Sequence, residues 1–323
     1  MSKTIELTPG LLLGMRAAYA RGENVMEYAR REAGAEDNFL AATLVAYDLQ
    51  SGSYVTHVTA DRESNDHWCA QLAGILSALL DAGSSLLEVG CGEATTLAGV
   101  LERLPAAPAH ALGFDISWSR CAVGREWLKS RSQQAALFVA DLFSIPLETN
   151  SVDVVYTSHS LEPNGGREEA ALLELLRVAR RAVVLVEPLY ELAPPEAQAR
   201  MRSHGYVRNL KATAERIGGR VADYRLLPYC GNLLNPSGLL VIEKCAAVCP
   251  EVTGGGPGFG EIAWRCPFSH AAMRAGSEAF FCAESGLAYP CLRGIPLLRS
   301  EHAVAASVFG SLVGGMHPGI ERK

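Results

Sequence analysis

The sequence has no apolar stretch that approaches the length of a transmembrane helix, which argues against a membrane protein. A signal peptide is not recognisable either, because the first 24 residues contain only a three-residue apolar run before Gly14 and Arg16. Basic residues are not in excess: 29 Lys and Arg stand against 35 Asp and Glu, a net charge of −6. Since nucleic-acid binders usually carry a basic excess, we expect a cytoplasmic protein that binds neither membranes nor nucleic acid.

The cysteines do not suggest a disulfide framework. There are nine of them, scattered along the chain, which is typical of reduced thiols in a cytoplasmic protein. Of the 323 residues, 49% are hydrophobic and 20% are charged, as in a globular protein with a substantial core. This length suits one large domain with additional segments, or two domains.

Residues 1–80 are predicted to form a helical lid. Apolar residues recur at helical spacing in Leu11–Glu32 and again in Phe39–Leu49. A third helix is expected to start at Ser64, a candidate N-cap, and to end at Gly83.

Residues 81–248 alternate short apolar runs with helical stretches, the pattern of an α/β fold. The first five runs are separated by stretches long enough for crossover helices, which predicts a doubly wound parallel sheet. The last two runs are joined only by residues 228–237, too short for a parallel crossover, so they are predicted to pair antiparallel at one sheet edge. The seven candidate strands are Ser85–Val89, Ala109–Asp115, Ala136–Ala140, Val152–Thr157, Ala182–Val186, Ala222–Leu227 and Gly238–Glu243.

A Gly- and Pro-rich linker at residues 250–260 marks the clearest boundary in the chain. Beyond it lies a small module at roughly 261–300, followed by a weakly patterned tail. We therefore treat residues 249–323 as a linker and a separate small module.

The first predicted strand ends in Glu88 and continues into Gly90-Cys91-Gly92. Glycines at this point let the backbone turn tightly and approach a ligand, while the next helix presents its amide groups. Asp115 ends the second strand and can accept both hydroxyls of a ribose. These features predict a nucleotide site at the carboxyl ends of the strands.

Two details favour a cationic ligand over a dinucleotide. Glu88 occupies a position that is usually apolar in dinucleotide-binding folds. The carboxylates of Glu88 and Glu93 would also repel a pyrophosphate, whereas they would not repel cationic S-adenosylmethionine. An NAD-dependent oxidoreductase is therefore the weaker interpretation.

The motifs LLEVGCGEATT, GFDIS and VADLFSIPLETNSVDVVYTSHSLE resemble those of class I S-adenosylmethionine-dependent methyltransferases, over about half the chain. The resemblance implies a seven-stranded Rossmann-like methyltransferase sheet and S-adenosylmethionine as cofactor. It places the methionine and ribose at Glu88, Gly90 and Gly92. The other cofactor residues that it implies are Asp115 and Ile116 for the ribose, Asp141 and Leu142 for the adenine, and Ser158.

The loop after the fourth strand faces the transferred methyl group in this fold. His159 is the candidate general base or orienting group, and Glu162 would orient it or bind substrate. Each also has a structural interpretation, since His159 can simply bond the loop and Glu162 can cap a helix. Asn164 is placed with the substrate, although it can equally shape the Asn-Gly-Gly turn. In the lid, Tyr47 is predicted to be catalytic.

Further candidate substrate residues are Tyr54 of the lid and a cluster after the fifth strand. Tyr47 and Tyr54 have the alternative of packing the lid against the sheet. Arginines beside a histidine and a tyrosine would grip a carboxylate or phosphate, although a solvated helix face also explains them. The cluster members assigned to substrate binding are Arg202, His204, Tyr206 and Arg208.

The C-terminal module resembles the small zinc-ribbon-like proteins that activate methyltransferases. It retains the Tyr-Pro and Gly-Ile-Pro signatures at Tyr289 and Gly294, but Ser269 and Ser285 replace the second cysteine of each pair. Serine is a poor zinc ligand, so we expect no metal in this degenerate module. Cys266, His270, Cys282 and Cys291 would bind zinc only with altered geometry. The module is expected to pack against the main domain or a dimer partner.

The sequence therefore predicts a methyltransferase that acts on an oxygen or nitrogen of a small molecule, either anionic or neutral. The sequence is compatible with a homodimer. One alternative keeps S-adenosylmethionine but attacks its aminocarboxypropyl chain, by transfer or by cyclisation to azetidine-2-carboxylate, releasing methylthioadenosine. Another is a non-catalytic interaction scaffold, against which the intact glycines and aspartates argue.

Overall fold

A computed structural model describes residues 6–35, 39–244 and 262–309. The predicted linker at 250–260, the boundary at 248/249 and the tail after residue 309 lie outside these residues. No helix within the described part of the chain is long and apolar enough to cross a membrane.

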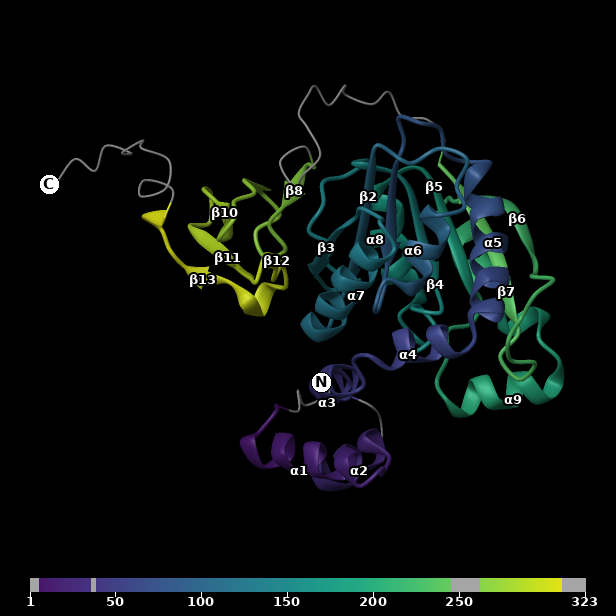
Figure 1. Cartoon of the computed structure of the whole chain (residues 1–323), viewed down its shortest axis with the longest axis horizontal. Helices are drawn as coiled ribbons and strands as arrows, with labels where there is room; N and C mark the ends of the chain where they lie inside the picture. The colour runs from purple at the N-terminus through teal and green to yellow at the C-terminus, as the bar shows by residue number, and fades with distance from the viewer. Residues whose placement is uncertain (1–5, 36–38, 245–261, 310–323) are drawn as a thin grey trace, which may run out of the picture.

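The centre of the molecule is a seven-stranded sheet with the order β3-β2-β1-β4-β5-β7-β6 (Figure 1). The first five strands are parallel, and β7 inserts antiparallel between β5 and β6 at one edge. This confirms the predicted α/β class, the doubly wound core and the terminal antiparallel pair. The strands are β1 Ser85–Val89, β2 His110–Asp115, β3 Ala136–Val139, β4 Val152–Ser158, β5 Ala179–Pro188, β6 Arg220–Leu226 and β7 Ser237–Glu243.

Both faces of the sheet are covered, because β1 is buried along its whole length and alternates its side chains between two apolar clusters. Leu86 belongs to one cluster and its neighbour Leu87 to the other. The helices α5 Arg62–Ser77, α6 Thr95–Leu101 and α7 Trp118–Ser130 supply the first cluster. The second contains side chains of α8 Glu168–Val178 and α10 Leu210–Arg216.

One crossover differs from the prediction. Residues 140–151, between β3 and β4, form turns rather than a helix. Pro146 lies in this segment, and Asn150 has a left-handed φ of 56°. Arg177 of α8 donates to the carbonyls of Ile145 and Leu147 at 2.8 and 2.7 Å, so the carbonyls that a helix would use are already bonded.

The N-terminal region is helical, with different boundaries from those predicted. Leu11–Glu32 is not one helix, because Gly22, with φ of 74°, separates α1 Pro9–Ala20 from α2 Val25–Ala33. The helix expected from Ser64 to Gly83 is α5; its N-cap is Asp61, whose carboxylate accepts from the Ser64 amide, and it ends at Ser77. The remaining elements here are α3 Leu40–Leu49 and α4 Ser53–Ala60.

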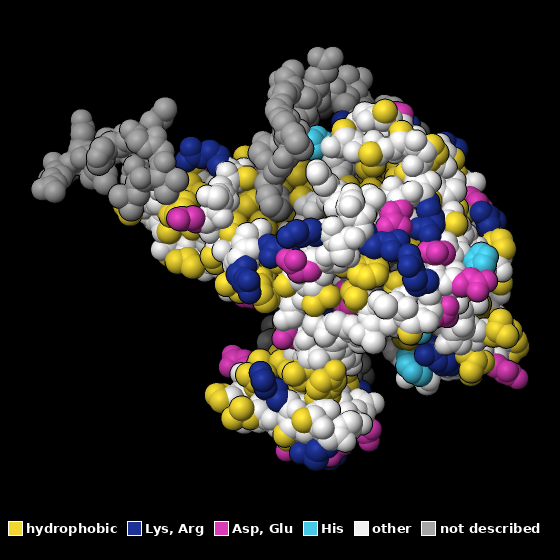
Figure 2. Space-filling model, viewed as in Figure 1, with side chains coloured by type: hydrophobic (Ala, Val, Ile, Leu, Met, Phe, Trp, Pro, Cys, Tyr) yellow, Lys and Arg dark blue, Asp and Glu magenta, His cyan; other side chains and the backbone are white. Residues whose placement is uncertain are grey.

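Helices α1 to α3 pack around their own small cluster, which includes Met15, Ala29 and Ala42. Figure 1 shows them as a separate layer beside the main sheet, joined to it through α4. In Figure 2, the face of the molecule carries basic and acidic side chains interspersed with one another.

The C-terminal module packs against the edge of the main sheet at β3 (Figure 1). Leu298 donates its amide to the Val139 carbonyl at 2.8 Å, and Leu297 forms a parallel bridge with Val139. The Trp264 ring meets Phe138 edge-on, with ring centroids 5.1 Å apart. The strands are β8 Trp264–Arg265, β9 Ala272–Met273, β10 Ala279–Cys282, β11 Leu287–Leu292, β12 Ile295–Pro296 and β13 Val304–Ala305.

Candidate active site

The turn after β1 requires glycine at two positions. Gly90 has φ of 67°, and a Cβ there would lie 2.4 Å from the Cβ of Ser160. Gly92 has φ of 53°, and its Cβ would lie 3.3 Å from the ring of Tyr54. Ser160 also donates its hydroxyl to the Val89 carbonyl at 2.6 Å. The β1 turn is thus held against the loop that follows β4.

Two buried carboxyl groups lie beside this turn. Asp115, at the end of β2, accepts from the Gly92 amide at 3.0 Å and from the Ser117 amide at 2.9 Å. Burial raises its pKa despite these bonds. Glu88 is only 2% exposed, and its Oε2 has no partner. Burial raises the pKa of Glu88 to about 8, which a nearby cationic group would reverse.

The lid is fixed to the cofactor turn by Glu93. Its two carboxylate oxygens accept the amides of Gly52 and Val55, both at 2.8 Å, at the N-terminus of α4. A carboxylate at a helix N-terminus is favoured both by the hydrogen bonds and by the helix dipole. Glu93 was predicted only as a charge near the ligand, and its partners show that it also holds α4 in place.

The lid tyrosines pack around Arg120 of α7. Its guanidinium carbon lies 4.8 Å from the ring centroid of Tyr47 and 4.5 Å from that of Tyr54. Arg120 also donates to the Tyr47 carbonyl at 3.1 Å. Burial raises the pKa of Tyr47 to about 12. This arrangement agrees with the packing alternative for both tyrosines, and their catalytic and substrate roles stay predictions.

The loop after β4 is organised by Glu187, at the end of β5. Its buried carboxyl group accepts three consecutive amides, those of Ser160, Leu161 and Glu162, at 3.0 to 3.1 Å. Burial raises the pKa of Glu187 to about 7. Asn164 donates to the carbonyls of Ser160 and Leu161, which is the turn-shaping role.

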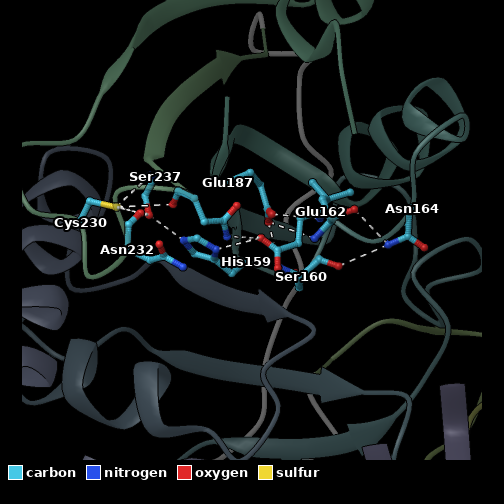
Figure 3. A network of polar contacts seen from close by, with 10 residues as sticks. His159, Ser160, Glu162, Asn164, Glu187, Cys230, Asn232 and Ser237 are labelled. Atoms are coloured by element: carbon cyan, nitrogen blue, oxygen red, sulfur yellow. Dashed lines mark hydrogen bonds and ion pairs between the residues drawn. The ribbon is translucent and has the colours of Figure 1, made fainter. Parts of the chain in front are cut away.

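Figure 3 shows His159 at the centre of this network. Its Nδ1 lies 3.0 Å from the Glu162 carboxylate, and its Nε2 lies 2.7 Å from the Ser237 hydroxyl at the start of β7. Burial lowers the pKa of His159, but the hydrogen bond and charge of Glu162 together with Glu187 raise it further, so the net pKa is above its ordinary value. His159 has φ of 55°, unusual for a residue other than glycine.

Helix α5 borders the same site. The ring of Trp68 in α5 lies 5.6 Å from the His159 ring. Gln71, one turn further along α5, bonds both the amide and the carbonyl of Tyr229, at 3.0 and 3.3 Å. Helix α5 and the loop before β7 are thereby fixed together next to His159.

The predicted arginine cluster is divided in space. Arg202 and Arg208 have guanidinium carbons 5.8 and 5.9 Å from the Tyr190 ring. Tyr206 instead lies beside Arg200, at 5.7 Å, and its pKa is raised by burial and by the charge of Glu162. Of the four cluster members, Tyr206 is the one whose pKa is affected by a residue of the His159 loop, Glu162. His204 is exposed and bonds the Arg200 carbonyl. These residues lie in or just after helix α9 Pro195–Ser203, which follows the short helix η1 Tyr190–Leu192.

The remaining predicted positions lie at the carboxyl ends of β2, β3 and β4. Ile116 follows Asp115, and Ser158 is the last residue of β4. Asp141 follows β3 by two residues and accepts the Phe143 amide at 2.9 Å, while Leu142 packs against the core. Their assignment to the cofactor stays a prediction.

In the C-terminal module, serine occupies the positions left by the missing cysteines. Ser269 donates its amide to the Cys266 sulfur at 3.3 Å, and its hydroxyl lies 3.5 Å from the Cys282 sulfur. The described residues contain no group of three or more His, Cys, Asp and Glu arranged to hold a metal. The absence of zinc remains a prediction.

The site residues that were not predicted include Trp68, Glu187, Asn235 and Ser237. Asn235 donates to the Glu162 carboxylate at 3.1 Å. A signal existed for Glu187, since it is an acidic residue at the carboxyl end of a predicted strand. The others come from segments distant in sequence and carry no motif.

Comparison with known proteins agrees with this geometry. Residues 86–182 match the family model described as a methyltransferase domain. No curated protein sequence matches the chain. The matched region runs from β1 into β5 and contains Gly90, Asp115 and His159. The match supports a methyltransferase-type enzyme with S-adenosylmethionine as its cofactor.

Several solved structures are similar to this chain. One is a SAM-dependent methyltransferase from Aquifex aeolicus, 16% identical, covering 53% of this chain and 87% of its own, with a TM-score of 0.42. Another is magnesium protoporphyrin IX methyltransferase from Synechocystis with bound S-adenosylhomocysteine, 16% identical, covering 65% and 90%, with a TM-score of 0.41. A methyltransferase in complex with the Trm112 activator, from Haloferax volcanii, is 14% identical and covers 61% and 96%, with a TM-score of 0.47.

Proposed function

We propose that the protein transfers the methyl group of S-adenosylmethionine to an oxygen or nitrogen of a small molecule. The observation that carries this proposal is the His159–Glu162 pair at the end of β4. A hydroxyl or ammonium acceptor must lose a proton, and a histidine oriented by a carboxylate is suited to take it.

The residues at the β1 turn fit the cofactor. Gly90 and Gly92 allow the tight turn after β1 to pack against Ser160 and Tyr54, and Glu88 has a buried oxygen without a partner. We assign Asp115 to the ribose hydroxyls and Glu88 to the positively charged methionine portion. When bound, S-adenosylmethionine would supply a methyl group activated by the positive sulfur, with S-adenosylhomocysteine as the leaving group.

The proton route follows from the contacts of His159. Both ring nitrogens are engaged, Nδ1 by Glu162 and Nε2 by Ser237. The acceptor proton therefore passes to Ser237 Oγ as Ser237 gives its own proton to Nε2. Glu162 stabilises the resulting imidazolium, and Asn235 holds Glu162 in position.

The lid and α5 favour a small acceptor. Trp68 stands over His159, and the Gln71–Tyr229 bonds close the site on the side of β7. Enclosure of this kind excludes water from the displacement.

The proposal is tested by identifying the nucleoside product. The full chain is incubated with S-adenosylmethionine and fractionated small-molecule extracts, and products are resolved by mass spectrometry. Accumulation of S-adenosylhomocysteine with an acceptor heavier by one methyl group supports methyl transfer. Methylthioadenosine as the product would overturn it in favour of attack on the aminocarboxypropyl chain.

The role of His159 is tested in the same assay with His159→Gln. Loss of a general base is expected to lower kcat by about 10²- to 10⁴-fold. The matched control is His270→Gln, an exposed histidine in the C-terminal module, which should leave kcat unchanged. Equal rates for His159→Gln and the wild-type enzyme would exclude His159 from the chemistry.

A further inference from the structure

A cavity of about 330 Å³ lies where the three parts of the chain meet. Helices α1 and α3 form one wall, and the ends of β2 and β3 with the start of α7 form the second. The third wall belongs to the C-terminal module. The module residues that line the cavity are Leu292, Leu297, Arg299 and His302, the last in the short helix η3 Ser300–His302.

The cavity begins next to the predicted ribose carboxylate. Ile116 and Ser117, the two residues after Asp115, line it. Ser117 donates its hydroxyl to Asp48 of α3 at 3.2 Å, which joins the lid to this wall. Apolar side chains of Trp118 and Leu49 make much of the remaining lining, as a flat aromatic ligand requires.

Two buried polar atoms of the module lack partners at this cavity. Arg299 is 3% exposed, and although its Nη2 pairs with Glu301, its Nε has no hydrogen bond. His302 Nδ1 is buried and also without a partner. A buried donor left unpaired destabilises the folded protein, so both atoms fit a ligand that supplies the missing bonds.

We infer that Arg299 and His302 of the C-terminal module bind the edge of the adenine ring of S-adenosylmethionine. This inference rests on the proposed function for its ligand. Adenine offers ring nitrogens that accept from Arg299 Nε, together with an exocyclic amine that donates. Ile116 and Leu297 lie on the cavity walls as apolar surfaces for the ring faces.

The protonation state of His302 agrees with a neutral ligand. Burial and the charge of Arg299 lower its pKa, so the imidazole is neutral at pH 7 and Nδ1 accepts or donates according to its tautomer. The other charged groups facing the cavity are Arg16 of α1 and Asp48 of α3, with Glu301 beside Arg299. Acidic and basic groups are therefore balanced there.

The module is fixed firmly enough to contribute to a binding site. Trp118 donates its indole NH to the Leu292 carbonyl at 3.1 Å, and Leu298 donates to Val139 at 2.8 Å. Both bonds join the module to the second wall of the cavity. The position of Arg299 relative to Ile116 is thereby set by the folded chain.

The first test is cofactor affinity, measured by calorimetry on the full chain. S-adenosylhomocysteine is compared with S-inosylhomocysteine, in which a carbonyl replaces the exocyclic amine. Arg299→Met and His302→Phe should each weaken S-adenosylhomocysteine binding by about tenfold and reduce the preference for it over the inosine analogue. Arg274→Met, an exposed arginine of the same module, is the matched control and should bind as the wild type does.

The second test uses the wild-type protein, so its result does not depend on whether a variant folds. An S-adenosylmethionine analogue with an azide on the adenine ring is photolysed with the wild-type protein, and labelled peptides are mapped. Label on the peptide containing Arg299 and His302 supports the inference.

The outcomes separate the two proposals. Wild-type protein that binds no S-adenosylhomocysteine refutes the cofactor assignment itself. Binding with unchanged affinity in the Arg299 and His302 variants, and label confined to residues 1–244, refutes the role of the module alone. Binding of inorganic phosphate at the cavity without competition from S-adenosylhomocysteine would likewise overturn the adenine assignment.

Discussion

At the residue scale, the contacts of His159 make Ser237 the key residue to change. Ser237→Ala removes the hydroxyl that contacts Nε2 and carries the proton in the proposed route, so kcat should fall by about 10²-fold while the acceptor KM changes little. Steady-state kinetics measure both constants. Ser237→Thr keeps a hydroxyl and should retain most of the activity. Full activity in Ser237→Ala would show that His159 acts on the acceptor directly.

The pH dependence tests the same pair. The proposed proton transfer needs neutral His159, so kcat/KM should rise with pH through a midpoint above 6.5, the ordinary histidine value. Glu162→Gln removes the charge that raises the pKa of His159, while burial, which lowers it, remains. The midpoint should therefore move to lower pH. Coincident pH–rate profiles for the two proteins would contradict this coupling.

Some of the candidate-site geometry follows from local sequence, and the contacts that sequence could not predict have a physical reason. Gly90, Asp115 and the spacing of His159 and Glu162 follow from local sequence, because each serves a turn or a strand end. Ser237 is 78 residues from His159 in sequence, and the two meet only because β7 inserts beside β5. No local pattern encodes that contact, and Ser237 was therefore missed.

At the element scale, Glu93 connects the cofactor turn to α4. Glu93→Ala removes the acceptor of two amide hydrogen bonds at the helix N-terminus, which should cost about 0.5–2 kcal/mol of local stability. Hydrogen exchange in residues 52–60 should become faster, and S-adenosylhomocysteine should dissociate more quickly. Glu63→Ala, an exposed residue in the first turn of α5, serves as control. Unaltered exchange in α4 would mean that other contacts hold the lid.

The region of α9 makes a separate prediction about an anionic acceptor. Arg200 has a buried Nη1 without a hydrogen-bond partner and lies beside Tyr206, whereas Arg202 and Arg208 surround Tyr190. Arg200→Met should raise the KM of an anionic acceptor about tenfold, with kcat preserved. The Arg202→Met, Arg208→Met double variant measures the contribution of the outer pair. If only the double variant raises KM, the anion binds at Tyr190 instead.

The boundaries of the buried core strands were predicted more accurately than those of the lid helices, and burial explains the difference. Strands of the core, such as β1, were predicted with their observed boundaries because continuous burial produces an unbroken apolar run. The lid helices were not, since Gly22 and the Asp61 cap set their ends locally within a similar apolar pattern. The helix expected within residues 140–151 was wrong for another reason. The carbonyls of Ile145 and Leu147 in this segment accept hydrogen bonds from Arg177 of α8.

At the scale of the whole molecule, the C-terminal module shares the core of the main domain. Trp264 meets Phe138 of β3 and Phe280 of β10 edge-on, at 5.1 and 5.0 Å. Trp264→Ala should destabilise the entire chain by about 3–5 kcal/mol, seen as a lower midpoint of one cooperative urea transition. Phe268→Ala, at a side chain 68% exposed, should change little. Two separate transitions in the variant, with the main domain unaffected, would contradict a shared core.

The bond between Leu298 and Val139 has a consequence for assembly. An unpaired edge strand is open to a strand from another chain, and here the outer side of β3 is already taken by a segment of the same polypeptide. Because both segments belong to one chain, this pairing is intramolecular. The pairing therefore does not weaken on dilution. Specific activity per chain should consequently stay constant from micromolar to nanomolar enzyme, with no added subunit needed to restore it.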